Sequence, residues 1–173
     1  AGFTSDNAGN NVVVPASHMA LRTMVLNDQV AFPWFAPAGT RRGGVSNATA
    51  SGYITSEGEF KSVALNPGQR DTLYTNKINP ITFLSGAGLV VFGQKTRARN
   101  ASALDRVNVR RLLIDVRRKV RNIANTLLFE PNRVETLEKF SALVNPILQR
   151  IQSQSGVDRY KVVIDTTTTT QAD

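Results

Sequence analysis

Cysteine is absent from this chain of 173 residues, and histidine and tryptophan occur once each. The lack of cysteine excludes disulfide bonds and thiolate metal ligands within the chain, which suits a reducing compartment. No stretch reaches about 18 consecutive apolar residues, so the sequence offers no candidate transmembrane helix and we expect no membrane insertion. Apolar residues still make up 41% of the chain, which is enough to bury a hydrophobic core.

Residues that could carry out catalysis are also scarce. The only histidine, His18, follows Ser17 at the start of a predicted helix, where neighbours in sequence do not face each other. The stretch "SGAGLV" over residues 85–90 lacks the third glycine of a nucleotide-binding loop and leads into a predicted strand rather than a helix. The acidic residues show neither paired carboxylates nor metal-ligand spacing. We therefore predict no catalytic residue, no metal ligand and no cofactor, and a protein that is not an enzyme.

Positive charge is concentrated in one part of the chain. Residues 95–121 contain ten basic side chains and only two acids, Asp105 and Asp115, and this segment accounts for the whole net charge of +8. A local basic patch indicates a negatively charged partner, such as nucleic acid, a membrane surface or an acidic protein. Nucleic acid is a serious alternative because an arginine-rich helix can neutralise phosphates, although the patch lacks aromatic residues for base stacking. A simple solvated helix face would give the same pattern.

The first half of the chain predicts short elements. We expect a strand over residues 12–14, a helix over 16–28 with Pro15 in its first turn, and a loop over 31–44 held by aromatic side chains. A hairpin over 46–65 would have Gly58 in its turn, and Asn66 would cap a short helix over 67–76. Two further strands, over 78–84 and 88–93, would be joined around residues 85–88.

The second half predicts two long amphipathic helices. Ser102 or Asp105 would cap the first, which continues to about Leu127, and Asn132 would cap the second, bent near Pro146 and ended by Gly156. A strand over 157–165 and an extended exit over 166–173 would follow. The predicted fold class is α/β (α+β), a small mixed sheet packed with two long helices and shorter ones. One core would combine the strands over 89–92 and 162–164 with the long helices, through Leu113, Val116, Val120, Leu137, Phe140 and Val144.

Several sequence blocks, read together, carry a family resemblance. They are "VPASHMALRTMVLND", "FAPAGTRRGGV", "RDTLYTNKINPI", "GLVVFGQKT", "ALDRVNVRRLL", "LFEPN" and "YKVVIDTTTTT". In order and spacing they resemble the conserved C-terminal region of the tail sheath protein of contractile-tailed bacteriophages. The resemblance covers nearly the whole chain after about Val12, and the blocks "INPI", "FG.KT", "DR.NVRRL" and "FEPN" are specific in combination.

The resemblance implies a structural role. Sheath subunits polymerise as stacked hexameric rings around the tail tube, and they contract to drive the tube through the host envelope. The implied partners are further copies of the chain, the tail tube protein, and the baseplate and tail terminator proteins, with no nucleic acid. The implied location is the virion tail, after assembly in the host cytoplasm. We expect residues 1–173 to form a single tube-proximal domain, a fragment of a longer sheath protein. The alternative is a basic nucleic-acid-binding module.

The phase of the basic helix selects a candidate contact surface. At about 100° per residue, Arg111 and Arg118 lie opposite the apolar stripe and can share Asp115, which is also within one turn of Lys119. A third part of the helix surface, the flank between the apolar stripe and the side opposite it, has no acid in the helix to offset its charge. It also includes an isoleucine, and this combination is typical of an interface. We predict that this flank contacts the tube or a neighbouring subunit, although its charges could instead be solvated or meet acids of the same subunit. Its members are Arg110, Ile114, Arg117 and Arg121.

A second candidate contact is the predicted strand near the end of the chain. By the resemblance, it would pair with a strand from a further part of the protein or from a neighbouring subunit, because an open strand edge offers unpaired main-chain groups. Its residues are Lys161, Val162, Val163, Ile164 and Asp165.

Overall fold

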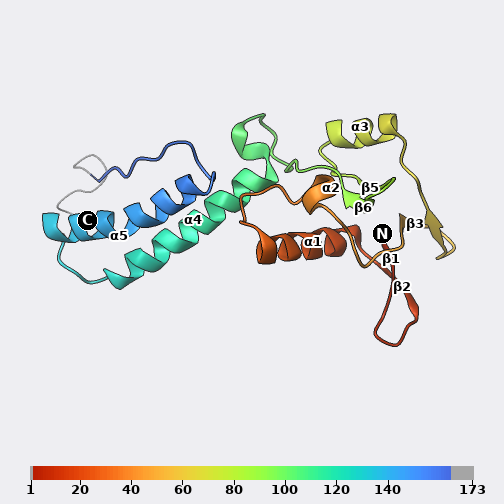
Figure 1. The fold of residues 1–173 in the computed structure, drawn as a ribbon, viewed down its shortest axis with the longest axis horizontal. Coiled ribbons are helices and arrows are strands. Elements are labelled where there is room, and N and C mark those ends of the chain that lie inside the picture. Colours follow the sequence, from red (N-terminus) through yellow and green to blue (C-terminus); the bar gives the residue numbers. More distant parts are fainter. Residues whose placement is uncertain (1, 165–173) are drawn as a thin grey trace. The chain divides into compact units, whose positions relative to one another are not determined.

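The computed structural model describes residues 2–164, and these fall into two compact units that divide between Arg110 and Arg111. Helices and short strands alternate along the chain (Figure 1), so the predicted α+β class is confirmed. Every strand pair is antiparallel, and the strands form two small sheets where one mixed sheet was predicted. The predicted extended exit over 166–173 lies outside the described residues.

The larger sheet has the strand order β2-β1-β3-β4. The predicted strand and hairpin are confirmed as β2 (Asn11–Val14), β3 (Ala50–Ile54) and β4 (Phe60–Ser62), with Gly58 at a φ of 85° in the turn. The central strand β1 (Gly2–Ser5) was not predicted. The Asp6 carboxylate stabilises the turn from β1 to β2 by accepting hydrogen bonds from the amide and the side chain of Asn10, which lower the pKa of Asp6.

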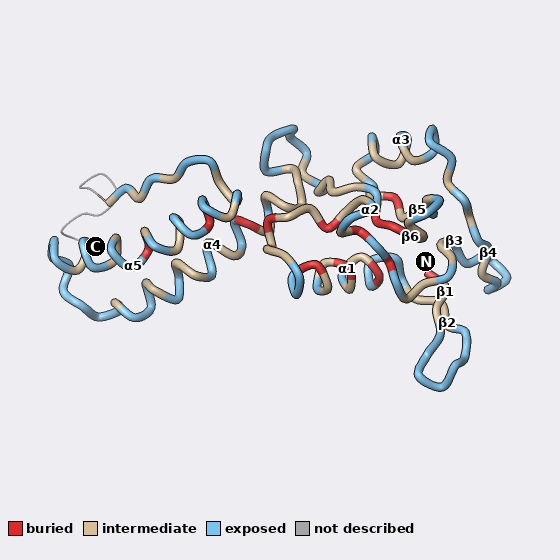
Figure 2. Tube along the Cα trace, viewed as in Figure 1, coloured by how far each residue is buried: buried red, intermediate tan, exposed pale blue. Residues whose placement is uncertain are grey.

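The smaller sheet is the predicted hairpin of β5 (Ile81–Leu84) and β6 (Gly88–Val91), with Ile81 opposite Val91. Strand β6 is buried along most of its length, and burial in this unit gathers on β6 and on one side of α1 (Figure 2). The core of the first unit is a cluster of Met19, Val45, Leu89 and Val91. Residues of β2, α1 and β5 pack around it.

The α-helices that belong wholly to the first unit are α1, α2 and α3. Helix α1 (Ala16–Val30) begins after Pro15, and α3 (Pro67–Thr75) begins at Asn66, whose side chain exchanges capping hydrogen bonds with Gln69. Both starts were predicted. Aromatic side chains hold the loop over 31–44 as expected, because the Phe32 ring stacks on the buried Trp34 with 4.8 Å between the ring centres. The loop also contains the short helix α2 (Gly39–Arg42), which was not predicted.

The second unit contains the two long helices. Helix α4 (Val107–Thr126) starts within the first unit, and α5 (Val134–Ser153) runs back in the opposite direction after a turn over 127–133 (Figure 1). Two predicted caps are wrong. Ser102 caps the 3-10 helix η1 (Ala103–Asp105) ahead of α4, and the N-cap position of α5 is Arg133, one residue after Asn132.

Backbone hydrogen bonds at the C-terminus of α5 explain why the helix ends near Gly156, as predicted. The amide of Gly156 donates to the carbonyl of Ile151 at 2.8 Å, and the amide of Ser155 donates to Gln152 at 3.0 Å. This pair of bonds is the Schellman pattern, and it places Ser155, rather than Gly156, in the left-handed region at a φ of 58°. The following residues, 157–164, form no strand, so the predicted strand is not formed over the part of it that the structure describes.

The predicted single core is also wrong. The strands belong to the first unit and α5 to the second, and the core cluster of the first unit includes none of the six helix residues predicted for it. Leu113 is 40% exposed and Phe140 is only half-buried. Of the six, only Val144 is buried, and the other buried apolar side chains described in the second unit are Leu112 and Ile151.

These burial differences predict a graded loss of stability. Replacing Ile151 with alanine removes a side chain that is 2% exposed, and should lower the free energy of unfolding by about 2–5 kcal/mol. The matched control, Leu143→Ala on the same helix, truncates a side chain that is 43% exposed and should cost about 1 kcal/mol or less. Chemical denaturation of both variants measures the difference. Equal losses would mean that the rotation of α5 is wrong.

Candidate assembly interface

Helix α4 combines a basic surface with one apolar side. It carries six basic side chains and a single acid, Asp115, in 20 residues. Leu112 is buried, and Val116, Val120 and Ile123 are half-buried at helical spacing, so these residues fix which side of the helix faces the protein. The opposite side is left to solvent.

The four residues predicted as a contact surface all lie away from the buried side, on the predicted flank. Arg110, Ile114, Arg117 and Arg121 follow one another at intervals of three or four residues and are all exposed, Ile114 by 54%. We call them the arginine face. Leu113, which was predicted to be in the core, is exposed beside them and adds apolar surface. The structure thus brings the predicted residues together, and their contact with a partner stays a prediction.

The two acids of the basic segment already have partners. Asp115 accepts from Lys119 at 2.6 Å, and Asp105 lies 3.2 Å from the guanidinium of Arg106. Within residues 2–164, the side chains of Arg110, Arg117 and Arg121 take part in no ion pair. The charge of the arginine face is therefore not neutralised by the part of the chain that the structure describes.

The second predicted contact, over residues 161–165, has a different character. Lys161 and Val163 are exposed, whereas Val162 and Ile164 are half-buried. The preceding residues are tied to α5, since the Gln152 side chain donates to the carbonyl of Asp158 at 2.7 Å. Asp165 lies outside the described residues. Strand pairing of this segment remains a prediction.

A polar cluster that was not predicted from the sequence joins three of the sequence blocks. The Asn79 side chain donates to the carbonyl of Lys95 at 2.9 Å and accepts from its amide at 2.8 Å. The Lys95 ammonium lies 3.9 Å from the centre of the Tyr74 ring, and Arg106 donates to the Tyr74 hydroxyl at 2.6 Å. The blocks "INPI", "FG.KT" and "DR.NVRRL" thus meet at one place, which we call the Asn79 cluster.

The glycine of "FG.KT" has a steric reason to be there. A Cβ atom on Gly93 would lie 2.8 Å from the Asn79 side-chain oxygen, closer than real contacts allow. The blocks quoted for the resemblance were the signal that could have located this cluster. Its groups satisfy one another within the chain, so they hold the first unit together and leave the arginine face to meet partners.

The described residues contain no site that resembles an active centre. His18, the only histidine, is exposed on α1. Among residues 2–164, no three His, Asp or Glu side chains are grouped so that they could hold a metal ion. None of the helices in that range is both long enough and apolar enough to cross a membrane.

Comparison with solved structures defines the class of fold. The PVC sheath complex of an extracellular contractile injection system, in its contracted state, matches 93% of this chain and 41% of that chain, with a TM-score of 0.73 and 24% identity. The anti-feeding prophage baseplate matches 92% of this chain and 40% of that chain, with a TM-score of 0.72 and 22% identity. No family model matches the chain. The fold is therefore one found in contractile injection systems.

Sequence comparison then identifies the particular relatives. The chain is 36% identical over 140 residues to the tail sheath protein of Vibrio phage KVP40, and 34% identical over 143 residues to that of Enterobacteria phage T4. These alignments cover 81% and 83% of this chain but 19% and 20% of the relatives, so the chain spans about a fifth of their length. The resemblance to phage tail sheath proteins, which are structural proteins and not enzymes, is confirmed.

The hydrogen bonds of the Asn79 cluster should contribute to the stability of the fold, and a substitution that changes no charge can test this. Asn79→Ala removes two hydrogen bonds to the backbone of Lys95 and should lower the free energy of unfolding by about 1–3 kcal/mol. Asn100→Ala, at an exposed position further along the same segment, is the matched control and should change stability by about 0.5 kcal/mol or less. Thermal unfolding followed by circular dichroism measures both. A neutral Asn79→Ala would remove the structural role assigned to the cluster.

Proposed function

We propose that this chain is part of the subunit of a contractile tail sheath. Subunits polymerise as stacked hexameric rings around a tail tube and contract to drive the tube through the host envelope. The sequence identity to phage tail sheath proteins supports this role, and the shared fold with contractile injection systems agrees with it. The tail of a virion would be its location, after assembly in the host cytoplasm, with baseplate and tail terminator proteins at the two ends.

The observation that carries the proposal is the arginine face. Arg110, Arg117 and Arg121 are exposed and unneutralised within residues 2–164, and Ile114 among them gives an apolar contact. We assign the tail tube, presenting acidic side chains, as their partner. An exposed ion pair contributes only about 0.2–1 kcal/mol, so each contact is weak on its own. Many weak contacts can register a sheath on its tube, and each still breaks when the subunit moves outward on contraction.

The segment Lys161–Asp165 supplies the second proposed contact. Residues 161–164 form no strand on their own, yet "KVVI" has the composition of one. A strand from a neighbouring subunit, or from a further part of the same protein, would pair with it through main-chain hydrogen bonds. This pairing would link subunits during contraction while the arginine contacts break.

Charge reversal tests the arginine face. The double variant Arg117→Glu with Arg121→Glu, made in the full-length protein, should fold normally because both side chains are exposed, and should fail to assemble on tubes. Arg97→Glu with Arg99→Glu changes the net charge equally at two other exposed positions of the basic segment, and should leave assembly intact. Electron microscopy of mixtures with purified tubes, at low and high salt, gives the result.

Two outcomes would contradict the proposal. Normal assembly of the Arg117/Arg121 double variant at both salt concentrations would remove the arginine face from the tube contact. Tight, salt-dependent binding of DNA by the wild-type subunit, abolished by the same double variant, would favour the nucleic-acid-binding alternative.

Hydrogen exchange tests the strand pairing. The backbone amides of Val162, Val163 and Ile164 should exchange rapidly in the isolated subunit and slowly in the assembled sheath, because pairing would engage them in main-chain hydrogen bonds. Amides in the exposed turn over residues 56–58 provide an internal control whose exchange should not change. Equal exchange of residues 162–164 in both states would rule out the pairing.

A further inference from the structure

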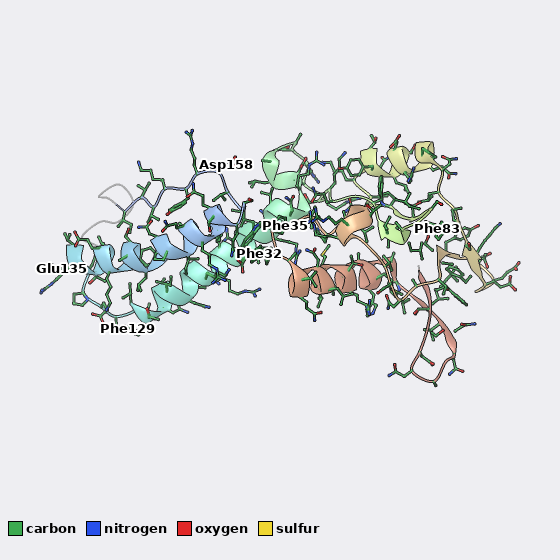
Figure 3. The ribbon with its side chains drawn as sticks, viewed as in Figure 1. Phe32, Phe35, Phe83, Phe129, Glu135 and Asp158 are labelled. Carbon is green, nitrogen blue, oxygen red and sulfur yellow. The ribbon has the colours of Figure 1, made fainter. Side chains whose placement is uncertain are left out.

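Phe129 combines exposure with a strained backbone. Its side chain is 97% exposed, the largest value among the large apolar residues of the described chain, and its φ is 72°. A bulky side chain rarely adopts a positive φ, because its Cβ comes too close to the following carbonyl oxygen. Phe129 lies in the turn between α4 and α5, at the end of the helical pair (Figure 3).

The turn itself explains the strain. The amide of Glu130 donates to the carbonyl of Leu127 at 3.1 Å and closes a four-residue turn with Phe129 at its third position. When only that position has a positive φ, as in a type II turn, glycine or asparagine normally occupies it. Phenylalanine therefore brings two costs, a strained backbone and a hydrated aromatic ring. No contact within residues 2–164 removes the ring from water.

The surroundings of Phe129 form an apolar tip with one acid. Leu128 is 62% exposed and Val134 is 66% exposed, and Glu130, the residue after Phe129, is also exposed. Strained residues persist only where the surrounding structure holds them, and they gather at sites of function. A partner that suits this tip would offer an apolar recess beside a positive charge.

The first unit contains such a recess. A cavity of about 400 Å³ lies between α2, α3 and the residues after β6, and it is open to solvent. Arg70 lies at this cavity with its guanidinium 5.1 Å from the centre of the Phe92 ring, and Phe92 is itself 43% exposed. The apolar lining consists of Ala36, Ala38, Tyr74, Pro80 and Phe92.

We propose that Phe129 of one copy inserts into this cavity of a neighbouring copy, with the Glu130 carboxylate facing Arg70. The inference rests on the proposed function, because it requires copies of the chain to assemble. Charge complementarity selects this cavity over the larger one of about 440 Å³, which no charged residue lines and which would leave Glu130 unpaired. Asp71 also lines the selected cavity, but it is exposed and can turn its carboxylate to water.

A contact of this kind is directional. Each copy offers its tip to one neighbour and its cavity to another, so the contact joins different surfaces and generates rings or open helices rather than closed pairs. Rings and helices are the assemblies that the proposed function needs.

The first test separates strain from binding. Phe129→Asn removes the ring but suits the positive φ, so the isolated full-length protein should melt at a higher temperature than the wild type. Assembly should weaken by roughly tenfold or more, as for the loss of a central aromatic anchor. Leu128→Asn, at a position without a positive φ, is the matched control and should not raise the melting temperature. Unchanged assembly of Phe129→Asn would overturn the proposal.

The second test locates the contact between copies. The sequence contains no cysteine, so each introduced cysteine is the only one within these 173 residues. One preparation carries Leu128→Cys, and a second, differently tagged preparation carries Asp71→Cys. Mixing them under oxidation should give a disulfide-linked heterodimer, which Phe129→Asn should abolish. Ser56→Cys, in the turn between β3 and β4, replaces Asp71→Cys as the control.

Two results would overturn the proposed contact. One is a cross-linking yield no higher than that of the Ser56→Cys control. The other is a yield that Phe129→Asn leaves unchanged. Failure of the inference is distinguishable from failure of the proposed function, because wild-type sheaths would still form on tubes in microscopy in the first case and not in the second.

Discussion

The imbalance of charge on α4 is the constraint from which the rest of the account follows. Six basic side chains and one acid share a single helix, and the one acid is held by Lys119. The buried Leu112 and its half-buried neighbours fix the rotation of the helix, so Arg117 and Arg121 must face outward. Like charges within one helical turn repel, and a helix of this composition gains stability from a negatively charged partner. The similarity to tail sheath proteins suggests which partner that is.

The sequence blocks that carry the family resemblance divide into two groups by structural role. Inside the first unit Asn79 bonds the backbone of Lys95, and Arg106 bonds Tyr74. Gly93 leaves the space that the Asn79 side chain occupies. In "LFEPN", by contrast, Phe129 is held in a strained turn and points to solvent. Residues of the first group serve the fold, whereas those of the second reduce the stability of the chain on its own and are explained by assembly.

The parts of the fold that the sequence predicted are those decided locally. Asn66 with Gln69 forms the capping box, Gly58 and Gly86 occupy positive-φ turns, and the spacing of Leu112, Val116 and Val120 sets the buried side of α4. Apart from the two misplaced helix caps, the errors arose where distant residues decide. Strand β1 follows no apolar pattern and exists because β2 and β3 pair with it. The segment "KVVI" forms no strand because no partner strand pairs with it among residues 2–164. The arginine face needed only helix phase, whereas the Asn79 cluster joins residues over 30 positions apart and could not be deduced from spacing.

The most direct measurement of the central claim is a high-resolution cryo-electron microscopy structure of the full-length protein assembled on its tail tube before contraction. The account predicts that the guanidinium groups of Arg117 and Arg121 lie within about 4 Å of carboxylate oxygens on the tube, and that these pairs are absent in the contracted state. A structure in which the exposed side of α4 faces bulk solvent, or another sheath subunit, while the sheath is intact on the tube would contradict it.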